Sequence, residues 1–182
     1  MSFLFNRGRA ASNRKIIDRL NDDIIAAVRN PVFYQSGDVP DTFNGRFELL
    51  VLHLALVVRR LGVLEDPAPA MGQDLIDTVF RYLDPAMREL GVGDMAVPKR
   101  MKKLAEAFLG RSVAYDLALR ATDGSLADAL SRNVHGGVRT ADAMSRYVRA
   151  SAAALDALDS TAFLNHGVAF PDPVPFFVPS GA

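Results

Sequence analysis

The chain has 182 residues, a formal net charge of zero, 49% hydrophobic residues and no cysteine. This length is typical of a single domain, and this hydrophobic content can build a real core, so a globally disordered chain is excluded. The missing cysteine excludes disulfides, thiolate catalysis and zinc-finger sites, and the zero net charge argues against a protein that coats DNA or other nucleic acid.

Motifs for catalysis, cofactors and metals are absent from the sequence. The three histidines, His53, His135 and His166, are far apart and form no H-x-x-x-H pair, so we expect no metal site. No G-x-G-x-x-G, Walker loop, G-x-S-x-G or H-E-x-x-H occurs. No apolar run reaches the roughly 18–20 residues of a transmembrane helix, and the first five residues lack the basic region of a signal peptide. We therefore expect a non-enzymatic binding protein without cofactors that stays in the cytoplasm, on the side of the membrane where it is made.

The first predicted helix follows a flexible basic segment, residues 1–11. Ser12 or Asn13 can cap this helix, which runs to about Arg29 and ends before an Asn-Pro pair. A second predicted helix runs from a cap at Asp41 to about Leu61.

The second predicted helix is apolar on nearly all sides. Its stripe contains Phe43, Phe47, Leu50, Leu54, Val57 and Leu61, and Leu49, Leu52 and Leu56 widen it. A helix of this kind packs on several sides, so we expect the 41–61 helix to be the most buried of the chain. His53 lies inside the run, and we interpret it as a core histidine held by a hydrogen bond.

Further helices are predicted from the 3.6-residue spacing of apolar positions, over residues 73–83, 85–90, 98–120, 125–135 and 140–158. Asp84 is the expected cap of the short 85–90 helix, and Ser125 with Asp128 resembles a capping box. Gly110 interrupts the long helix without shifting its stripe, which predicts a close approach of another backbone. The sequence thus predicts an all-α single domain of six or seven helices over residues 12–159.

A tail rich in proline and phenylalanine, residues 160–182, follows this domain. It has four prolines between Pro171 and Pro179, interleaved with Phe170, Phe176 and Phe177. This composition predicts an extended, polyproline-like chain, and the phenylalanines indicate that it lies on the domain surface or binds a partner.

The long 98–120 helix has a basic face. Lys99, Arg100, Lys102 and Lys103 lie away from its apolar stripe, and only Glu106 opposes them. This is either a solvated helix face or a docking patch for an anionic partner such as ribosomal RNA, a lipid surface or an acidic protein.

Several ordered blocks resemble the ubiquinol–cytochrome c chaperones, assembly factors of the respiratory bc1 complex. The blocks are Pro31-Val32-Phe33-Tyr34, D-T-F-N-G-R-F-E-L-L-V-L-H at 41–53, the 75–80 segment, R-E-L-G-V-G-D at 88–94, V-P-K-R-M-K-K-L at 97–104, G-R-S-V-A-Y-D at 110–116 and the 130–134 segment. They cover roughly residues 15–135. The short leader is similar to bacterial, alphaproteobacterial-like members, whereas mitochondrial members carry a targeting extension.

The resemblance implies a chaperone that holds newly made cytochrome b during assembly of the bc1 complex. Its mitochondrial relatives work with a small partner at the ribosomal tunnel exit. Two other hypotheses stay open from the sequence. One is a lipid- or isoprenoid-handling protein of the quinone pathway that uses Asp18, Asp22 and His53, and the other is a membrane-peripheral adaptor. A closed apolar cavity with converging polar residues would favour the lipid-handling protein over an open groove.

We predict a partner-binding surface from charged residues in the family-like blocks. It comprises Arg46, Arg88, Asp94, Lys99, Arg100, Lys103, Arg111, Tyr115 and Asp116. A structural alternative is that Arg88 or Arg111 pairs with Asp94 or Asp116 to fix a turn.

Overall fold

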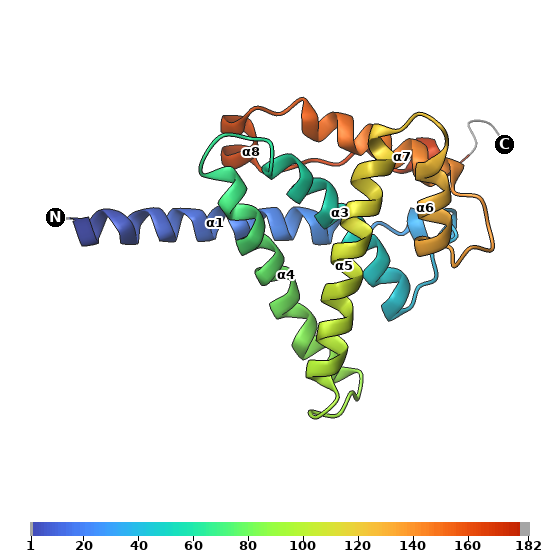
Figure 1. Cartoon of the computed structure of the whole chain (residues 1–182), viewed down its shortest axis with the longest axis horizontal. Coiled ribbons are helices and arrows are strands. Elements are labelled where there is room, and N and C mark those ends of the chain that lie inside the picture. The colour runs from blue at the N-terminus through green and yellow to red at the C-terminus, as the bar shows by residue number, and fades with distance from the viewer. Residues whose placement is uncertain (1, 179–182) are drawn as a thin grey trace.

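The computed structural model describes the backbone of residues 2–178 and the side chains of residues 13–178 (Figure 1). Over this part of the chain the secondary structure is entirely helical, which confirms the all-α prediction. The helices are α1 (Ser2–Val28), α2 (Val32–Gln35), α3 (Phe43–Leu61), α4 (Ala68–Glu89), α5 (Val97–Arg120), α6 (Ser125–Val134), α7 (Asp142–Asp156), α8 (Ser160–His166) and α9 (Val174–Phe177). Two of them, α2 and α9, have only four residues each, and the others have seven or more.

Helix α3 is the centre of the fold. It contacts α1, α4, α5, α6 and α7, and 12 of its 19 residues are buried. This confirms that the 41–61 helix is the most buried one. The predicted cap at Asp41 is wrong: Thr42 has the extended backbone of a cap, and its hydroxyl accepts the N–H of Gly45 at 3.2 Å. The Asp41 carboxylate instead pairs with Arg46 at 2.7 Å.

Helices α4 and α5 form a hairpin that projects from the layer containing α1, α7 and α8 (Figure 1). The two predicted helices over 73–90 are one helix, with Pro85 inside it, and the predicted cap at Asp84 is wrong. The Asp84 carboxylate instead accepts a hydrogen bond from the Arg88 side chain, one turn later on the same helix, at 2.7 Å. The close approach predicted at Gly110 is also wrong, because a methyl group there would meet no atom within 4 Å.

Two other predicted helix starts differ in the structure. Helix α1 begins at Ser2 and extends well past the other helices, so a cap at Ser12 or Asn13 is wrong (Figure 1). At α6 the cap residue is Gly124, with a left-handed φ of 84°, and the Asp123 carboxylate accepts the Ser125 N–H at 3.1 Å. The Ser125 capping box is therefore wrong, since the preceding turn supplies the acceptor.

The C-terminal segment folds back onto the core. The extended, polyproline-like prediction is wrong for 160–166 and 174–177, which are helical; Asp159 caps the first of these helices through the Ala162 N–H at 2.7 Å. The prediction that the phenylalanines lie on the domain is confirmed. The ring of Phe170 meets the His53 ring edge-on at 4.7 Å, and Phe177 packs against Phe33 at 5.6 Å between ring centroids.

Candidate binding groove

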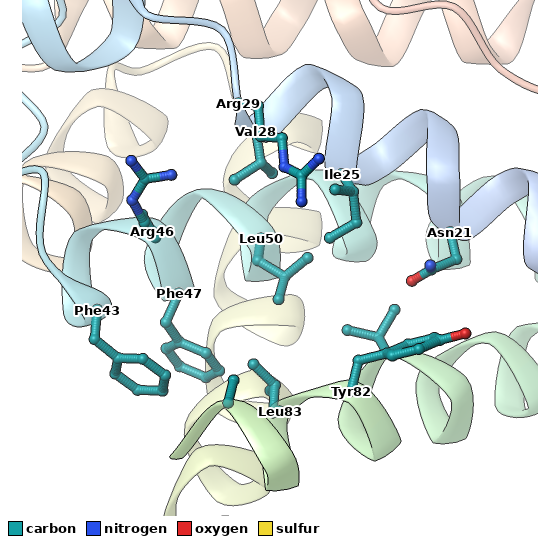
Figure 2. Close-up of a pocket in the computed structure, with 12 residues that line it drawn as sticks. Asn21, Ile25, Val28, Arg29, Phe43, Arg46, Phe47, Leu50, Tyr82 and Leu83 are labelled. Atoms are coloured by element: carbon teal, nitrogen blue, oxygen red, sulfur yellow. The ribbon is translucent and has the colours of Figure 1, made fainter. Parts of the chain in front are cut away.

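An apolar groove opens between α1, α3 and α4 (Figure 2). Its volume is about 350 Å³. The apolar side chains that line it are Ile25 and Val28 from α1, Phe43, Phe47 and Leu50 from α3, and Val79, Leu83 and Ala86 from α4. Grooves of this size and character are typical sites for an apolar ligand or helix.

The groove exists because α3 is apolar on nearly every side. Its neighbours α1 and α4 contact both α3 and each other, and part of the apolar surface of α3 forms the floor between them. Phe47 and Leu50 are only 5% and 7% exposed, so most of each side chain is buried beneath the floor. Tyr82 of α4 lies at the mouth and is 59% exposed, which is unusual for a large aromatic ring.

Three polar side chains accompany this apolar lining. Arg29 and Arg46 carry positive charge, and Asn21 is buried, with an amide oxygen that has no hydrogen-bond partner within residues 13–178. Arg46 also lies over the Tyr34 ring at 4.9 Å, a cation–π contact. The Tyr34 hydroxyl donates to the carbonyl of Val28 at 2.7 Å, so Tyr34 of α2 links the end of α1 to Arg46 near the start of α3.

His53 lies in the core and away from this groove. It is 0% exposed, its Nδ1–H donates to the Leu49 carbonyl at 2.7 Å, and its Nε2 accepts from the Tyr147 hydroxyl at 2.8 Å. This confirms its interpretation as a hydrogen-bonded core histidine. Burial lowers the pKa of His53 to about 4, so the ring is neutral at pH 7.

The nine residues of the predicted surface separate into several structural settings. Arg46 lines the groove, whereas Arg88 and Asp94 form an ion pair at the α4–α5 tip. Lys99, Arg100 and Lys103 are exposed near the start of α5, with no ion pair in the described part of the chain.

The remaining members of that prediction have structural partners. Arg111 makes two hydrogen bonds to Glu48, both at 2.6 Å, and Asp116 pairs with Arg59 at 3.2 Å. Burial raises the pKa of Glu48 although Arg111 opposes the shift. Tyr115 is 1% exposed, so its placement on a surface is wrong.

The alternative that these arginines pair with nearby aspartates is therefore confirmed for Arg88, which pairs with Asp94. It is wrong in detail for Arg111, whose partner is Glu48 rather than Asp94 or Asp116. Because Glu48 lies 63 residues earlier in the chain, no local pattern could show this pair.

The polar groups of the lipid-handling hypothesis do not converge on one cavity. His53 is enclosed in the core, and Asp18 lines a separate hollow with Asp74, Asp77 and Arg81. Within the described residues, no group of three His, Asp or Glu side chains could hold a metal ion.

The groove residues Asn21, Arg29 and Tyr82 were not singled out by the sequence. Each has an ordinary place in a helical pattern, and only the packing of α1 against α4 brings them to one groove. The one available signal was Tyr82, a large ring outside the apolar stripe of its helix.

An all-α domain with an open apolar groove is an architecture that can accommodate an apolar helix or ligand. A family model described as ubiquinol-cytochrome C chaperone matches residues 35–170. The chain thus belongs to the ubiquinol-cytochrome C chaperone family, as the sequence blocks predicted. The match extends beyond residue 135 and includes α6, α7 and α8.

Two relatives illustrate this membership. The chain is 24% identical over 139 residues to "Ubiquinol-cytochrome-c reductase complex assembly factor 1" of Xenopus laevis, covering 74% of this chain and 70% of the relative. It is also 35% identical in sequence to the Cbp3 homolog from the alphaproteobacterium Brucella abortus. The match to the crystal structure of that protein has a TM-score of 0.85 and covers 96% of this chain and 99% of the Brucella chain. Across the residues that the structure describes, no helix is long and apolar enough to cross a membrane.

Proposed function

We propose that this protein binds newly made cytochrome b and supports its entry into the bc1 complex, acting by binding rather than by catalysis. The observation that carries the proposal is the groove between α1, α3 and α4, in a chain of the bc1 assembly family. A membrane protein exposes apolar helices before its partners and lipids cover them. An apolar groove can cover one such helix, as other helix-binding proteins do.

The exposed aromatic ring at the mouth supports this use of the groove. Aromatic side chains are enriched in protein interfaces and supply large contact area at small cost in conformational entropy. Tyr82 is exposed in the free protein, and a helix lying in the groove would cover it.

The basic face of α5 supplies a second part of the proposal. Lys99, Arg100 and Lys103 are free to meet the anionic surface of the inner membrane or the ribosome. Such contact would hold the chain on the cytoplasmic side of the membrane, next to the place where cytochrome b is inserted.

The test is site-specific photo-crosslinking in cells. A benzoyl-phenylalanine at Tyr82 is expected to capture cytochrome b, whereas one at Val138, which is 83% exposed and does not line the groove, is not. Capture of cytochrome b at Val138 but not at Tyr82 would move the client away from the groove. If neither position captures it and affinity capture from membranes does not enrich it, the proposed client is wrong.

A further inference from the structure

We infer that the groove between α1, α3 and α4 selects an apolar helix that carries an acidic residue near one end and a hydrogen-bond donor about two turns away. The inference rests on the proposed function, because it takes the occupant to be a helix of the client. It adds the chemistry by which the groove distinguishes one apolar helix from another.

One end of the groove is positive. Two of its lining residues, Arg29 and Arg46, are basic, and none of the lining residues is acidic. Asp41 neutralises part of the charge of Arg46, but Arg29 has no ion pair or side-chain hydrogen bond within residues 13–178. Its guanidinium lies over Leu50, above the apolar floor (Figure 2).

The backbone adds to this positive charge. Helix α3 starts at Phe43, which lines the same end of the groove, and the first N–H groups of a helix carry partial positive charge. The Tyr34 side chain fixes the arrangement, since its hydroxyl holds the carbonyl of Val28 and its ring lies beneath Arg46. A carboxylate placed here is attracted by two guanidinium groups and a helix terminus, whereas an ammonium group is repelled.

Asn21 provides a second, independent indication of a ligand. It is 7% exposed, it lines the groove, and its amide oxygen has no partner in the described chain. The oxygen is enclosed in the free protein, so a rotation of the amide toward the groove would present it to a donor on the occupant; a buried acceptor without a partner costs free energy, which that donor would recover. Figure 2 places Asn21 beside Tyr82, on the other side of Ile25 from Arg29.

The spacing of these two polar groups favours a helix over a lipid. Asn21 lies on α1, and Arg29 directly follows its last residue, with its N–H still donating to the Ile25 carbonyl. The two residues are eight apart, which is about 12 Å along the helix axis. A helix packed along α1 presents matching side chains seven or eight residues apart on one face. A fatty acid has one polar end, so it could satisfy Arg29 but would leave Asn21 without a partner.

The experiment measures the binding of fluorescent apolar helical peptides to the full chain by anisotropy. The peptides carry Glu, Gln or Lys near one end and either Ser or Ala seven residues away. At low salt the Glu peptide is expected to bind up to about five-fold more tightly than the Gln peptide, as one partly exposed ion pair allows, with the Lys peptide weakest. Added salt should reduce this preference.

Variants of the two polar groups test their separate roles. Arg29→Gln should reduce the preference for Glu, because Arg46 and the start of α3 remain, and Arg29→Glu should reverse it toward the Lys peptide. Asn21→Leu should weaken the Ser peptides and leave the Ala peptides unchanged. Arg132→Gln is the matched control, because Arg132 is an exposed arginine outside both the groove and the basic face of α5, and it should keep the wild-type order. An unchanged melting temperature shows that each variant is folded.

Equal binding of the three peptides, or an order that Arg29→Glu does not change, overturns the inference. So does oleate that binds more tightly than every peptide and depends on Arg29 but not on Asn21, since the occupant is then a lipid. If crosslinking captures cytochrome b while the peptides show no charge preference, only this inference fails. If the preference holds and no cytochrome b is captured, the proposed client fails and the selectivity of the groove stands.

Discussion

Helices α3 and α5 contact one another and are both long, yet they differ in what their surfaces do. Helix α3 buries 12 of its 19 residues, whereas α5 buries only 4 of its 24. Helix α3 also holds the buried His53 and the floor of the groove, and α5 carries the basic face. The difference teaches that the stability of the fold is concentrated around α3, and that α5 can present charge to a partner without affecting the core.

The sharpest test of this contrast is a pair of leucine truncations. Leu54→Ala on α3 removes a side chain that is 1% exposed, so we expect a loss of about 2–5 kcal/mol in the free energy of unfolding. Leu109→Ala on α5 removes one that is 62% exposed and should cost less than about 0.5 kcal/mol. Urea unfolding followed by circular dichroism measures both, and equal losses would contradict the contrast.

The next effect concerns pH. Because the folded pKa of His53 is lowered to about 4 from its ordinary 6.5, the unfolded chain binds this proton more readily. The contribution of the neutral His53 ring to the free energy of unfolding is therefore fully present above pH 6.5 and is lost as the pH falls toward 4. This contribution is about 3 kcal/mol. His53→Gln should remove this part of the pH dependence, whatever its own cost at pH 7. Parallel stability curves for the two proteins would show that His53 titrates normally.

A smaller effect separates two arginines of the predicted surface. Arg111 and Glu48 are 22% and 12% exposed, so Arg111→Ala leaves a largely buried carboxylate without its hydrogen-bond partner and should cost about 1–3 kcal/mol. Arg88→Ala, at the exposed tip, should leave the urea midpoint unchanged. If Arg88→Ala were the more damaging variant, the tip would contribute more to the fold than its exposure indicates.

The smallest effect on stability is expected at the basic face of α5. Changing Lys99, Arg100 and Lys103 together to glutamate should alter the free energy of unfolding by less than about 0.5 kcal/mol. Vesicles containing anionic lipid should bind wild type and not this variant, and wild-type binding should fall with salt, because exposed charges are screened over about 8 Å. In cells the variant should accumulate less cytochrome b and less bc1 complex. Normal levels of both would remove this face from the mechanism and leave the groove.

The sequence predicted those elements that depend on neighbouring residues. The apolar spacing of the 41–61 and 98–120 segments is local, and both helices formed close to those bounds. Helix ends were less predictable, because Asp41 and Thr42 are both good caps and only the folded chain shows that Asp41 pairs with Arg46.

The site was harder to predict than the fold. Asn21, Arg29 and Tyr82 meet through tertiary packing, and the pairing of Arg111 with Glu48 spans two helices. A pattern of charge along the chain identified exposed residues such as Lys99, but it could not separate them from the buried Tyr115.

Because the C-terminal segment packs against α3, part of the core can form only after the end of the chain has been synthesised. Phe170 covers His53 of α3, and Phe177 covers Phe33 of α2, although both helices leave the ribosome more than a hundred residues earlier. Until residues 168–177 have emerged, the middle of α3 lacks part of its aromatic cover, and the nascent chain itself exposes apolar surface. The protein should therefore complete its fold only late in translation, so a ribosome that stalls before residue 168 would release a chain that proteases can recognise as unfinished.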